Sequence, residues 1–293
     1  MRFMRLGPYG SERPVVVHEG RTYDLTPVTS DIDGDFFMRD GLAMTRRALA
    51  TRSLRPLEIG RERVGAPVAR PQAVVCVGQN YATLSDELGL PAAKEPVIFL
   101  KHPNSIVGPY DDIRIPPGAE CVDWEVELAV VMGAPAAYLE SDEEALACIA
   151  GVTIANDVSE RSLQMSNSGG QWAKGKSAPT FNPLGPALVP LEAVQDLQDL
   201  RLNTWVNGEL RQDASTGDML FDVASLIRRI SHYLTLEAGD VVNTGTPGGV
   251  AHSGRFPYLR NGDVIEMEID GLGRQRQRLV ATPPRELTIP TER

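Results

Sequence analysis

Along most of the chain, hydrophobic and polar positions alternate over short stretches that end in Gly or Pro turns, which is typical of β-strands. After residue 70, two stretches instead space their apolar residues as a helix does. The first begins after Ser141, a predicted N-cap with Glu144 three residues on, and we expect Gly151 to end it. The second covers residues 217–234, and its core-facing stripe consists of Met219, Val223, Leu226, Ile230 and Leu234. The pattern predicts a β-rich α+β fold with few helices.

Turn signals and prolines indicate how these elements are grouped. Asn207-Gly208 and Asp270-Gly271 each follow a strand-like run, which predicts a β-hairpin at each position. Residues 1–70 hold short strand-like pieces and one helix-like piece, and they end in a proline-spaced link. We therefore expect a small N-terminal lobe in residues 1–70 and a main domain in residues 71–293.

One strand-like run, residues 123–133, is apolar on both faces except for two glutamates. Glu125 and Glu127 point to the same face, because side chains alternate along a strand. A strand that is apolar on both faces is typically covered on both sides. The two carboxylates should then lie inside the protein, where either their pKa values rise or a cation lies between them. A second pair, Glu266 and Glu268, alternates with apolar residues, and a solvated face explains it.

A third acid, Asp157, ends an apolar stretch that follows the first predicted helix. Acids at strand ends are often turn formers or helix caps, and that alternative stays open. Together with Glu125 and Glu127, however, Asp157 offers three carboxylate oxygens without a nearby His or Cys. Such a set favours a hard divalent ion, Mg²⁺ or Mn²⁺, with Ca²⁺ as an alternative. A 2-oxo acid could occupy the open positions of that ion, whose charge would stabilise an enolate.

Composition and charge limit the partners. The formal net charge of −10 argues against nucleic acid or an anionic membrane as the main partner, because both require a basic surface. No apolar run approaches the ~20 residues that cross a bilayer, and the first residues lack the apolar core of a signal peptide, so we expect a cytoplasmic protein. The three scattered cysteines predict free thiols. An acidic protein can still bind a small anion if its site carries cations or a metal.

Residues 170–177, GQWAKGKS, match the phosphate-binding pattern GxxxxGK[ST]. That pattern needs a strand before the loop and a helix after it, so that free N–H groups point at the phosphates. The preceding residues are polar and Gly-rich, and Pro179, Pro183 and Pro186 lie where the helix would run. The sequence therefore argues against a nucleotide site, and Lys176 requires another role.

Several blocks, in order along the chain, resemble the fumarylacetoacetate hydrolase superfamily. They cover residues about 70 to 280 and include CVGQNYA, DWEVELAVVMG, GVTIANDVSERSLQ, QWAKGKSAPTFNPLGP and NTGTPGGV. The sequence is most similar to bacterial members that act on acylpyruvates and diketo-deoxy sugar acids. The resemblance implies a mixed β-sandwich roll, usually a homodimer, with one Mg²⁺ or Mn²⁺ in each active site.

The same resemblance assigns roles to individual residues. It implies that the metal ligands are Glu125, Glu127 and Asp157. It implies that the substrate is held by Arg161, Gln164, Lys176 and Thr246. Lys176 would then place a positive charge beside the substrate dicarbonyl or its developing enolate, and Arg161 could clamp a carboxylate. Independently of the resemblance, Arg161 and Gln164 are three residues apart, so a helical turn would place them on one side.

One departure concerns water activation. The hydrolytic members of the superfamily usually carry a His-x-x-Glu pair on a segment that closes over the site. Here the His position is Leu84, which cannot accept a proton, while the acid is retained as Glu87. Glu87 could still act as the base or could be a solvated helix residue. His102 is the nearest imidazole in the sequence that could replace the missing one.

The first hypothesis is a Mg²⁺- or Mn²⁺-dependent hydrolase that cleaves a C–C bond in an acylpyruvate-type β-diketo acid through an enolate. The alternative keeps the metal and the enolate without an attacking water, as a 2-oxo acid decarboxylase or a keto–enol tautomerase or isomerase. A third hypothesis is an inactive metabolite-binding dimer. The acyl group of the substrate depends on pocket-forming loops such as residues 84–95 and 163–172, which carry no readable code.

Overall fold

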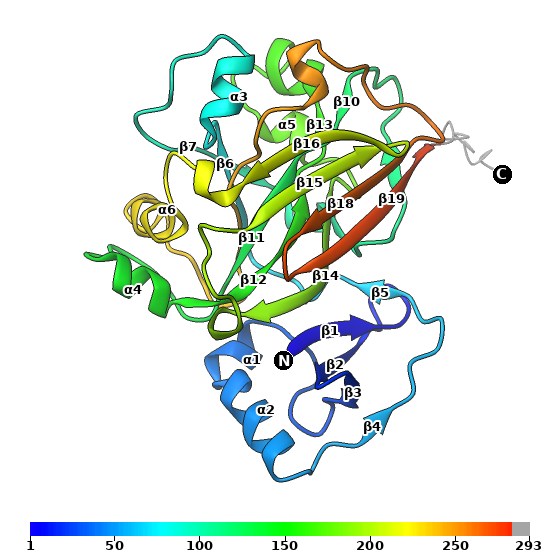
Figure 1. The fold of residues 1–293 in the computed structure, drawn as a ribbon, viewed down its shortest axis with the longest axis vertical. Coiled ribbons are helices and arrows are strands. Elements are labelled where there is room, and N and C mark those ends of the chain that lie inside the picture. The colour runs from blue at the N-terminus through cyan, green and yellow to red at the C-terminus, as the bar shows by residue number, and fades with distance from the viewer. Residues whose placement is uncertain (283–293) are drawn as a thin grey trace, which may run out of the picture.

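The computed structural model describes residues 1–282, and most of its strands belong to one twelve-stranded sheet (Figure 1). In spatial order, the main path of this sheet runs through β4 (Pro56–Leu57), β3 (Arg21–Asp24), β2 (Arg13–His18), β1 (Arg2–Leu6), β14 (Asn182–Pro190), β12 (Ile149–Asn156), β11 (Val126–Met132), β17 (Val241–Asn243), β6 (Val74–Gly78) and β7 (Val97–Lys101). The two strands off this path are β5 (Val64–Gly65), which pairs with β1, and β8 (Ile106–Val107), which pairs with β14.

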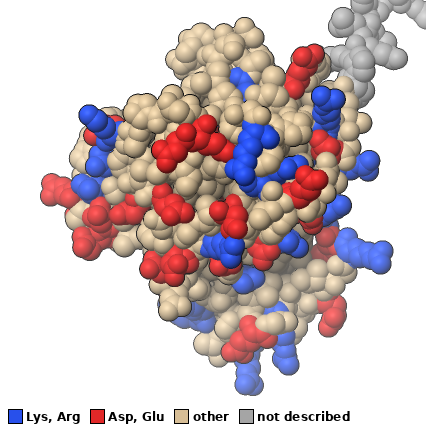
Figure 2. All heavy atoms as spheres, turned by 45° about the horizontal axis from the view of Figure 1, so that its top comes forward, with Lys and Arg blue, Asp and Glu red and all other residues tan. Residues whose placement is uncertain are grey.

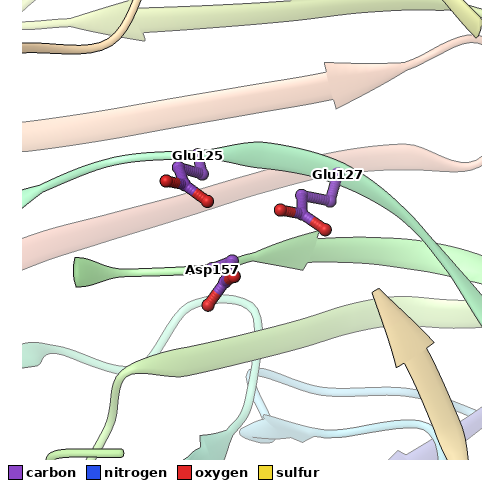
Figure 3. Close-up of side chains that lie close together, drawn as sticks. All are labelled: Glu125, Glu127 and Asp157. Atoms are coloured by element: carbon purple, nitrogen blue, oxygen red, sulfur yellow. The ribbon is translucent and has the colours of Figure 1, made fainter. Parts of the chain in front are cut away.

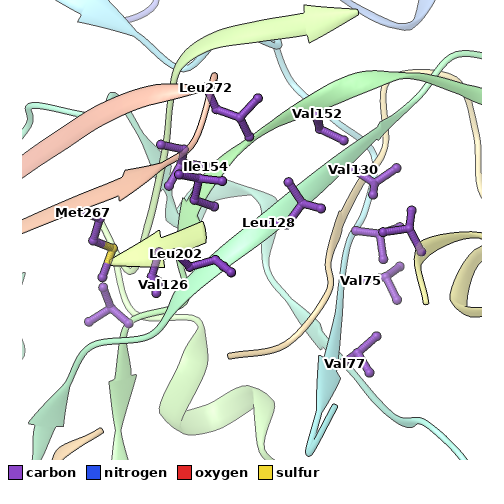
Figure 4. Packing of buried hydrophobic residues seen from close by; sticks show 14 of the residues in the cluster. Val75, Val77, Val126, Leu128, Val130, Val152, Ile154, Leu202, Met267 and Leu272 are labelled. Carbon is purple, nitrogen blue, oxygen red and sulfur yellow. The ribbon is translucent and has the colours of Figure 1, made fainter. Parts of the chain in front are cut away.

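A second sheet of five strands packs against the large one. Its order is β16 (Glu209–Ser215), β15 (Arg201–Val206), β18 (Val264–Ile269), β19 (Gly273–Ala281) and β9 (Ile113–Ile115). A separate two-stranded ladder joins β10 (Val122–Asp123) to β13 (Ser159–Glu160). The main hydrophobic core lies between the two larger sheets, where Leu128 and Ile154 meet Leu202 and Met267 (Figure 4). The predicted β-rich α+β fold is confirmed.

Both faces of β11 are covered, as the apolar pattern of its sequence predicts. Val126, Leu128 and Val130 belong to the core between the sheets. On the opposite face, Ala129 and Val131 pack into two further buried clusters. The side chain of Glu127 lies on this second face, so β11 carries a carboxylate into the interior.

The helices are short. They are α1 (Gly34–Met38), α2 (Gly41–Ala50), α3 (Ala82–Glu87), α4 (Asp142–Ala147), α5 (Ala173–Lys176) and α6 (Val223–Ile230). Single helical turns are η1 (Pro103–Ser105), η2 (Ser162–Ser166), η3 (Leu191–Ala193), η4 (Thr216–Asp218) and η5 (Ala251–Ser253). Ser141 caps α4, because its side chain accepts a hydrogen bond from the Glu144 N–H.

The prediction that Gly151 ends the first helix is wrong. Helix α4 already ends at Ala147, and Gly151 lies inside β12. An added Cβ at Gly151 would lie 2.3 Å from the Val189 carbonyl oxygen of the paired strand β14. The glycine therefore permits close strand packing rather than a helix stop.

Both predicted hairpins form. Asn207 and Gly208 have φ values of 52° and 82°, the left-handed geometry that a two-residue turn between β15 and β16 requires. The second hairpin joins β18 to β19 through residues 270–272, which include Asp270 and Gly271. On β18, Glu266 and Glu268 are half-buried and alternate with buried apolar residues, so the predicted contrast with Glu125 and Glu127 is confirmed.

The N-terminal residues form one end of the large sheet. Strand β1 pairs with β14 at Phe3 and Leu188, so the large sheet continues from residues of the predicted lobe into those of the predicted main domain. Helices α1 and α2 lie beside this end (Figure 1). Phe3, Phe36 and Leu188 share a buried cluster with Val131 of β11. Of the predicted main domain, residues 283–293 lie outside the described residues.

Two sequence expectations concern the rest of the molecule. The three cysteines are free; Cys76 is buried, and the other two are half-buried. None of the helices within residues 1–282 has the length and apolar composition of a membrane-spanning helix. On the face shown in Figure 2, acidic and basic side chains are interspersed.

Candidate metal centre and substrate cavity

Three buried acids converge at the ends of two neighbouring strands. Glu125 directly precedes β11, Glu127 lies within it, and Asp157 directly follows β12. The antiparallel register brings Asp157 beside Glu125, and the Asp157 N–H donates to the Glu125 carbonyl oxygen at 2.9 Å. One carboxylate oxygen from each residue lies within 4.8 Å of the others (Figure 3). The acids that the sequence indicates as metal ligands therefore share one site.

Lys176 and Arg161 supply positive charge to this cluster. The Lys176 ammonium donates to Glu125 at 2.8 Å and to Asp157 at 2.9 Å. Arg161 contacts the other Glu125 oxygen at 2.7 Å. Burial opposes ionisation of Glu125, but the charges of Lys176 and Arg161 outweigh it and lower its pKa. Burial also disfavours the charged form of Lys176, but Asp157 and Glu125 outweigh that effect and raise its pKa.

A third cation, Lys101, lies in the cluster, and the sequence reasoning missed it. Lys101 ends β7, is buried, and pairs with Asp157 while donating to the Val158 carbonyl oxygen at 3.0 Å. Burial lowers the pKa of Lys101, although Asp157 opposes that change. The available signal was a lysine at the end of an apolar strand, within the block EPVIFLKHP.

Glu127 lacks such a counter-charge. Within residues 1–282 it makes no ion pair, and one carboxylate oxygen accepts the Gly245 N–H at 2.8 Å. Burial, together with the negative charges of Asp157 and Glu125, raises the pKa of Glu127 well above its ordinary value. A cation between the three acids would reverse this effect. The site offers hard oxygen donors that converge, so its residues fit a divalent ion such as Mg²⁺ or Mn²⁺.

A cavity of about 220 Å³ adjoins the acids. Its polar wall includes Glu125, Arg161, Gln164, Lys176, Thr246 and His252. Its apolar wall consists of Val77, Leu84, Leu88, Leu90, Phe99, Met165 and Trp172. A compact anion with an apolar end matches this division of the walls.

The predicted substrate residues all lie on the polar wall. Arg161 and Gln164 share a helical turn, and Arg161 Nη1 donates to Gln164 Oε1 at 2.9 Å. The Thr246 hydroxyl donates to the Val126 carbonyl oxygen at 2.9 Å. Lys176 ends the four-residue helix α5 and is buried against acids, so GQWAKGKS does not form a phosphate loop.

The segment that should carry the missing histidine borders the cavity. Leu84 of α3 lines it, whereas Glu87 lies outside its lining. One oxygen of Glu87 accepts the Gly249 N–H at 2.6 Å, and this bond fastens α3 to the loop that follows β17. His102 is exposed at the start of η1 and does not line the cavity. Catalysis by Glu87 stays a prediction, and His102 is not in place to replace the lost imidazole.

Comparison with known proteins places the chain in a family. Residues 73–280 match the model of the fumarylacetoacetate (FAA) hydrolase C-terminal domain. The mitochondrial oxaloacetate tautomerase FAHD2B of Bos taurus is 47% identical over 233 residues, which cover 79% of this chain and 74% of the relative. The chain therefore belongs to the fumarylacetoacetate hydrolase family, as its sequence blocks indicate, and its relatives are named as hydrolases, tautomerases and isomerases.

Solved structures agree in fold. The fumarylacetoacetate hydrolase of Exiguobacterium antarcticum has 37% identity and a TM-score of 0.83, with 96% of this chain and 100% of that chain covered. The maleylpyruvate hydrolase of Sphingobium sp. SYK-6, solved with manganese(II) and pyruvate, has 26% identity and a TM-score of 0.78, with 97% and 100% covered.

We expect Glu127→Gln to weaken binding of Mg²⁺ and Mn²⁺ by more than tenfold, about 1.4 kcal/mol. The variant keeps the side-chain shape and disturbs no ion pair of the cluster, but it removes one negative oxygen donor. Isothermal titration calorimetry measures the affinity, and Glu266→Gln on the outer face of β18 is the matched control. Equal affinities for wild type and Glu127→Gln would falsify the assignment.

Proposed function

We propose that the protein catalyses keto–enol tautomerisation of a small 2-oxo acid at this centre. The observation that carries the proposal is a cavity lined by Glu125, Arg161 and Lys176 that has Leu84 at the position where the resemblance implies a water-activating imidazole. Tautomerisation needs a stabilised enolate and a proton carrier, but no attacking water. The naming of the bovine relative as an oxaloacetate tautomerase supports the same chemistry.

The residues of the polar wall divide the work. A divalent ion held by the three acids would polarise the 2-oxo group and stabilise the charge of the enolate. Arg161, with Gln164 beside it, binds the substrate carboxylate through its guanidinium. The Lys176 ammonium, fixed by Glu125 and Asp157, stabilises negative charge on the enolate oxygen.

The charge of the site favours a substrate with one carboxylate at this wall. With every group ionised, the four carboxylates of Asp123, Glu125, Glu127 and Asp157 exceed the three cations of Lys101, Arg161 and Lys176 by one. A bound divalent ion would change this excess of one negative charge into an excess of one positive charge. One substrate carboxylate then makes the site neutral, which lowers the cost of burying the charges.

C–C hydrolysis of an acylpyruvate is a second candidate function. The apolar wall, which includes Leu88, Phe99 and Trp172, suits an acyl chain that oxaloacetate lacks. Two solved relatives are named as hydrolases of fumarylacetoacetate and maleylpyruvate. Decarboxylation of oxaloacetate would break the C3–C4 bond, release CO₂ and leave the enolate of pyruvate, which the same centre could stabilise, and it is measured in the same assay as pyruvate release.

We expect the Mg²⁺- or Mn²⁺-loaded protein to tautomerise oxaloacetate faster than it hydrolyses acetylpyruvate. Leu84→His should raise hydrolysis by about 10²–10⁴, the usual contribution of a positioned base, and should change tautomerisation by less than about tenfold. Enol absorbance reports tautomerisation, and product mass reports hydrolysis.

Leu88→His is the matched control, because it adds an imidazole to the same wall at a position that is not followed by a glutamate three residues later. Fast hydrolysis by wild type that Leu84→His leaves unchanged would contradict the proposal in favour of the hydrolase.

For Lys176→Met we expect turnover of oxaloacetate to fall by about 10²–10³, the typical loss when a stabilising donor to a developing oxyanion is removed. Lys174→Met, which alters an exposed lysine of the same helix, should have no effect.

We expect no ATP binding at GQWAKGKS, so the midpoint of thermal unfolding of wild type should be the same with ATP and Mg²⁺ as with Mg²⁺ alone. A midpoint that rises with the logarithm of ATP concentration would restore the nucleotide site.

A further inference from the structure

A histidine that the sequence reasoning did not single out lines the cavity. All four histidines of the chain lie within residues 1–282, and His252 is the one on the cavity wall. It belongs to η5, six residues after Thr246. Val250, two residues before it, packs against Leu84 in one buried cluster. The imidazole therefore comes from the segment next to the position where the family's histidine is missing.

The backbone of His252 is held firmly. Asp123 accepts the N–H groups of Ala251 and His252, each at 2.9 Å. The same carboxylate accepts Arg161 Nε at 2.8 Å. Asp123 thus links the turn that carries His252 to the guanidinium that faces the substrate. This link fixes the distance between the histidine backbone and the proposed carboxylate clamp.

The imidazole ring is free to act on a ligand. No side chain or backbone group within residues 1–282 forms a hydrogen bond with its nitrogens, and the residue is half-buried. Burial and the charges of Arg161 and Lys176 lower the pKa of His252, against the opposing charges of Asp123 and Glu125. A neutral ring near pH 7 can accept a proton.

We propose that His252 is the proton-transfer residue of this enzyme, an inference that rests on the proposed tautomerase function. The neutral imidazole takes a proton from C3 of the 2-oxo acid. The electrons of the broken C–H bond form the C2=C3 double bond, and the electrons of the C=O π bond move to the oxygen. Proton return to that oxygen gives the enol, so the step needs no oxidant or further reactant. The reverse order converts enol to keto acid.

This assignment explains how the chain can lack the family's histidine and still move a proton. Leu84 closes an apolar part of the wall, while the base comes from η5. A base placed for the C3 proton is not thereby placed to activate a water at an acyl carbon. Leucine in place of the family's histidine at position 84 therefore favours enolisation over hydrolysis.

The test uses pyruvate as the probe, because its methyl protons exchange with D₂O when it enolises. With Mn²⁺ or Mg²⁺ bound, wild type should exchange these protons for deuterium. Mass spectrometry follows the exchange with either ion, and proton NMR follows it with Mg²⁺. His252→Gln should slow exchange by about 10²–10⁴. Calorimetry should show that the variant still binds pyruvate within about threefold of wild type. His18→Gln, on the N-terminal lobe, is the control and should exchange normally.

A second measurement does not depend on the loaded enzyme. In the metal-free protein, the His252 ring should titrate below the ordinary histidine pKa of about 6.5, and its NMR signal should disappear in His252→Gln. Equal exchange by wild type and His252→Gln would overturn the assignment while leaving the proposed function standing. Absence of both pyruvate exchange and oxaloacetate tautomerisation in wild type would overturn both.

Discussion

Three carboxylates buried side by side need positive charge in the same place, and much of this structure follows from that requirement. Burial and mutual repulsion both oppose their ionisation, and an unpaired buried charge costs several kcal/mol. Lys101, Arg161 and Lys176 each approach the cluster from a different segment. Glu127 is left without a cationic partner, and a divalent ion supplies what the side chains do not.

The architecture explains why the acids are buried. Strand β11 lies between the core of the two packed sheets and the cluster that includes the N-terminal lobe, so neither face reaches water. The Gly245 N–H and the Thr246 hydroxyl then bind the loop after β17 to β11. Asp123 extends this connection to Arg161 and η5. The metal centre and the cavity wall are therefore parts of one hydrogen-bonded unit.

Much of this arrangement is readable from local sequence. Glu125 and Glu127 stand out because they interrupt an apolar pattern on a strand covered on both sides, and the half-buried Glu266 and Glu268 show the ordinary case. The local sequence did not indicate that Lys101 and His252 belong to the site, because their positions there depend on contacts with segments distant in the chain. The prediction that Gly151 ends a helix is wrong for a related reason, because Gly151 lies in a strand that pairs with the distant strand β14. The local sequence pattern therefore predicts which acids are buried better than it predicts which distant residues contact them.

The central claim is that the three acids bind one divalent ion that completes the charge of the site. The most direct measurement is anomalous X-ray diffraction from crystals grown with Mn²⁺. The account predicts one anomalous peak between Glu125, Glu127 and Asp157, about 2.1 Å from an oxygen of each. A manganese peak elsewhere, or no peak at saturating Mn²⁺, would contradict it.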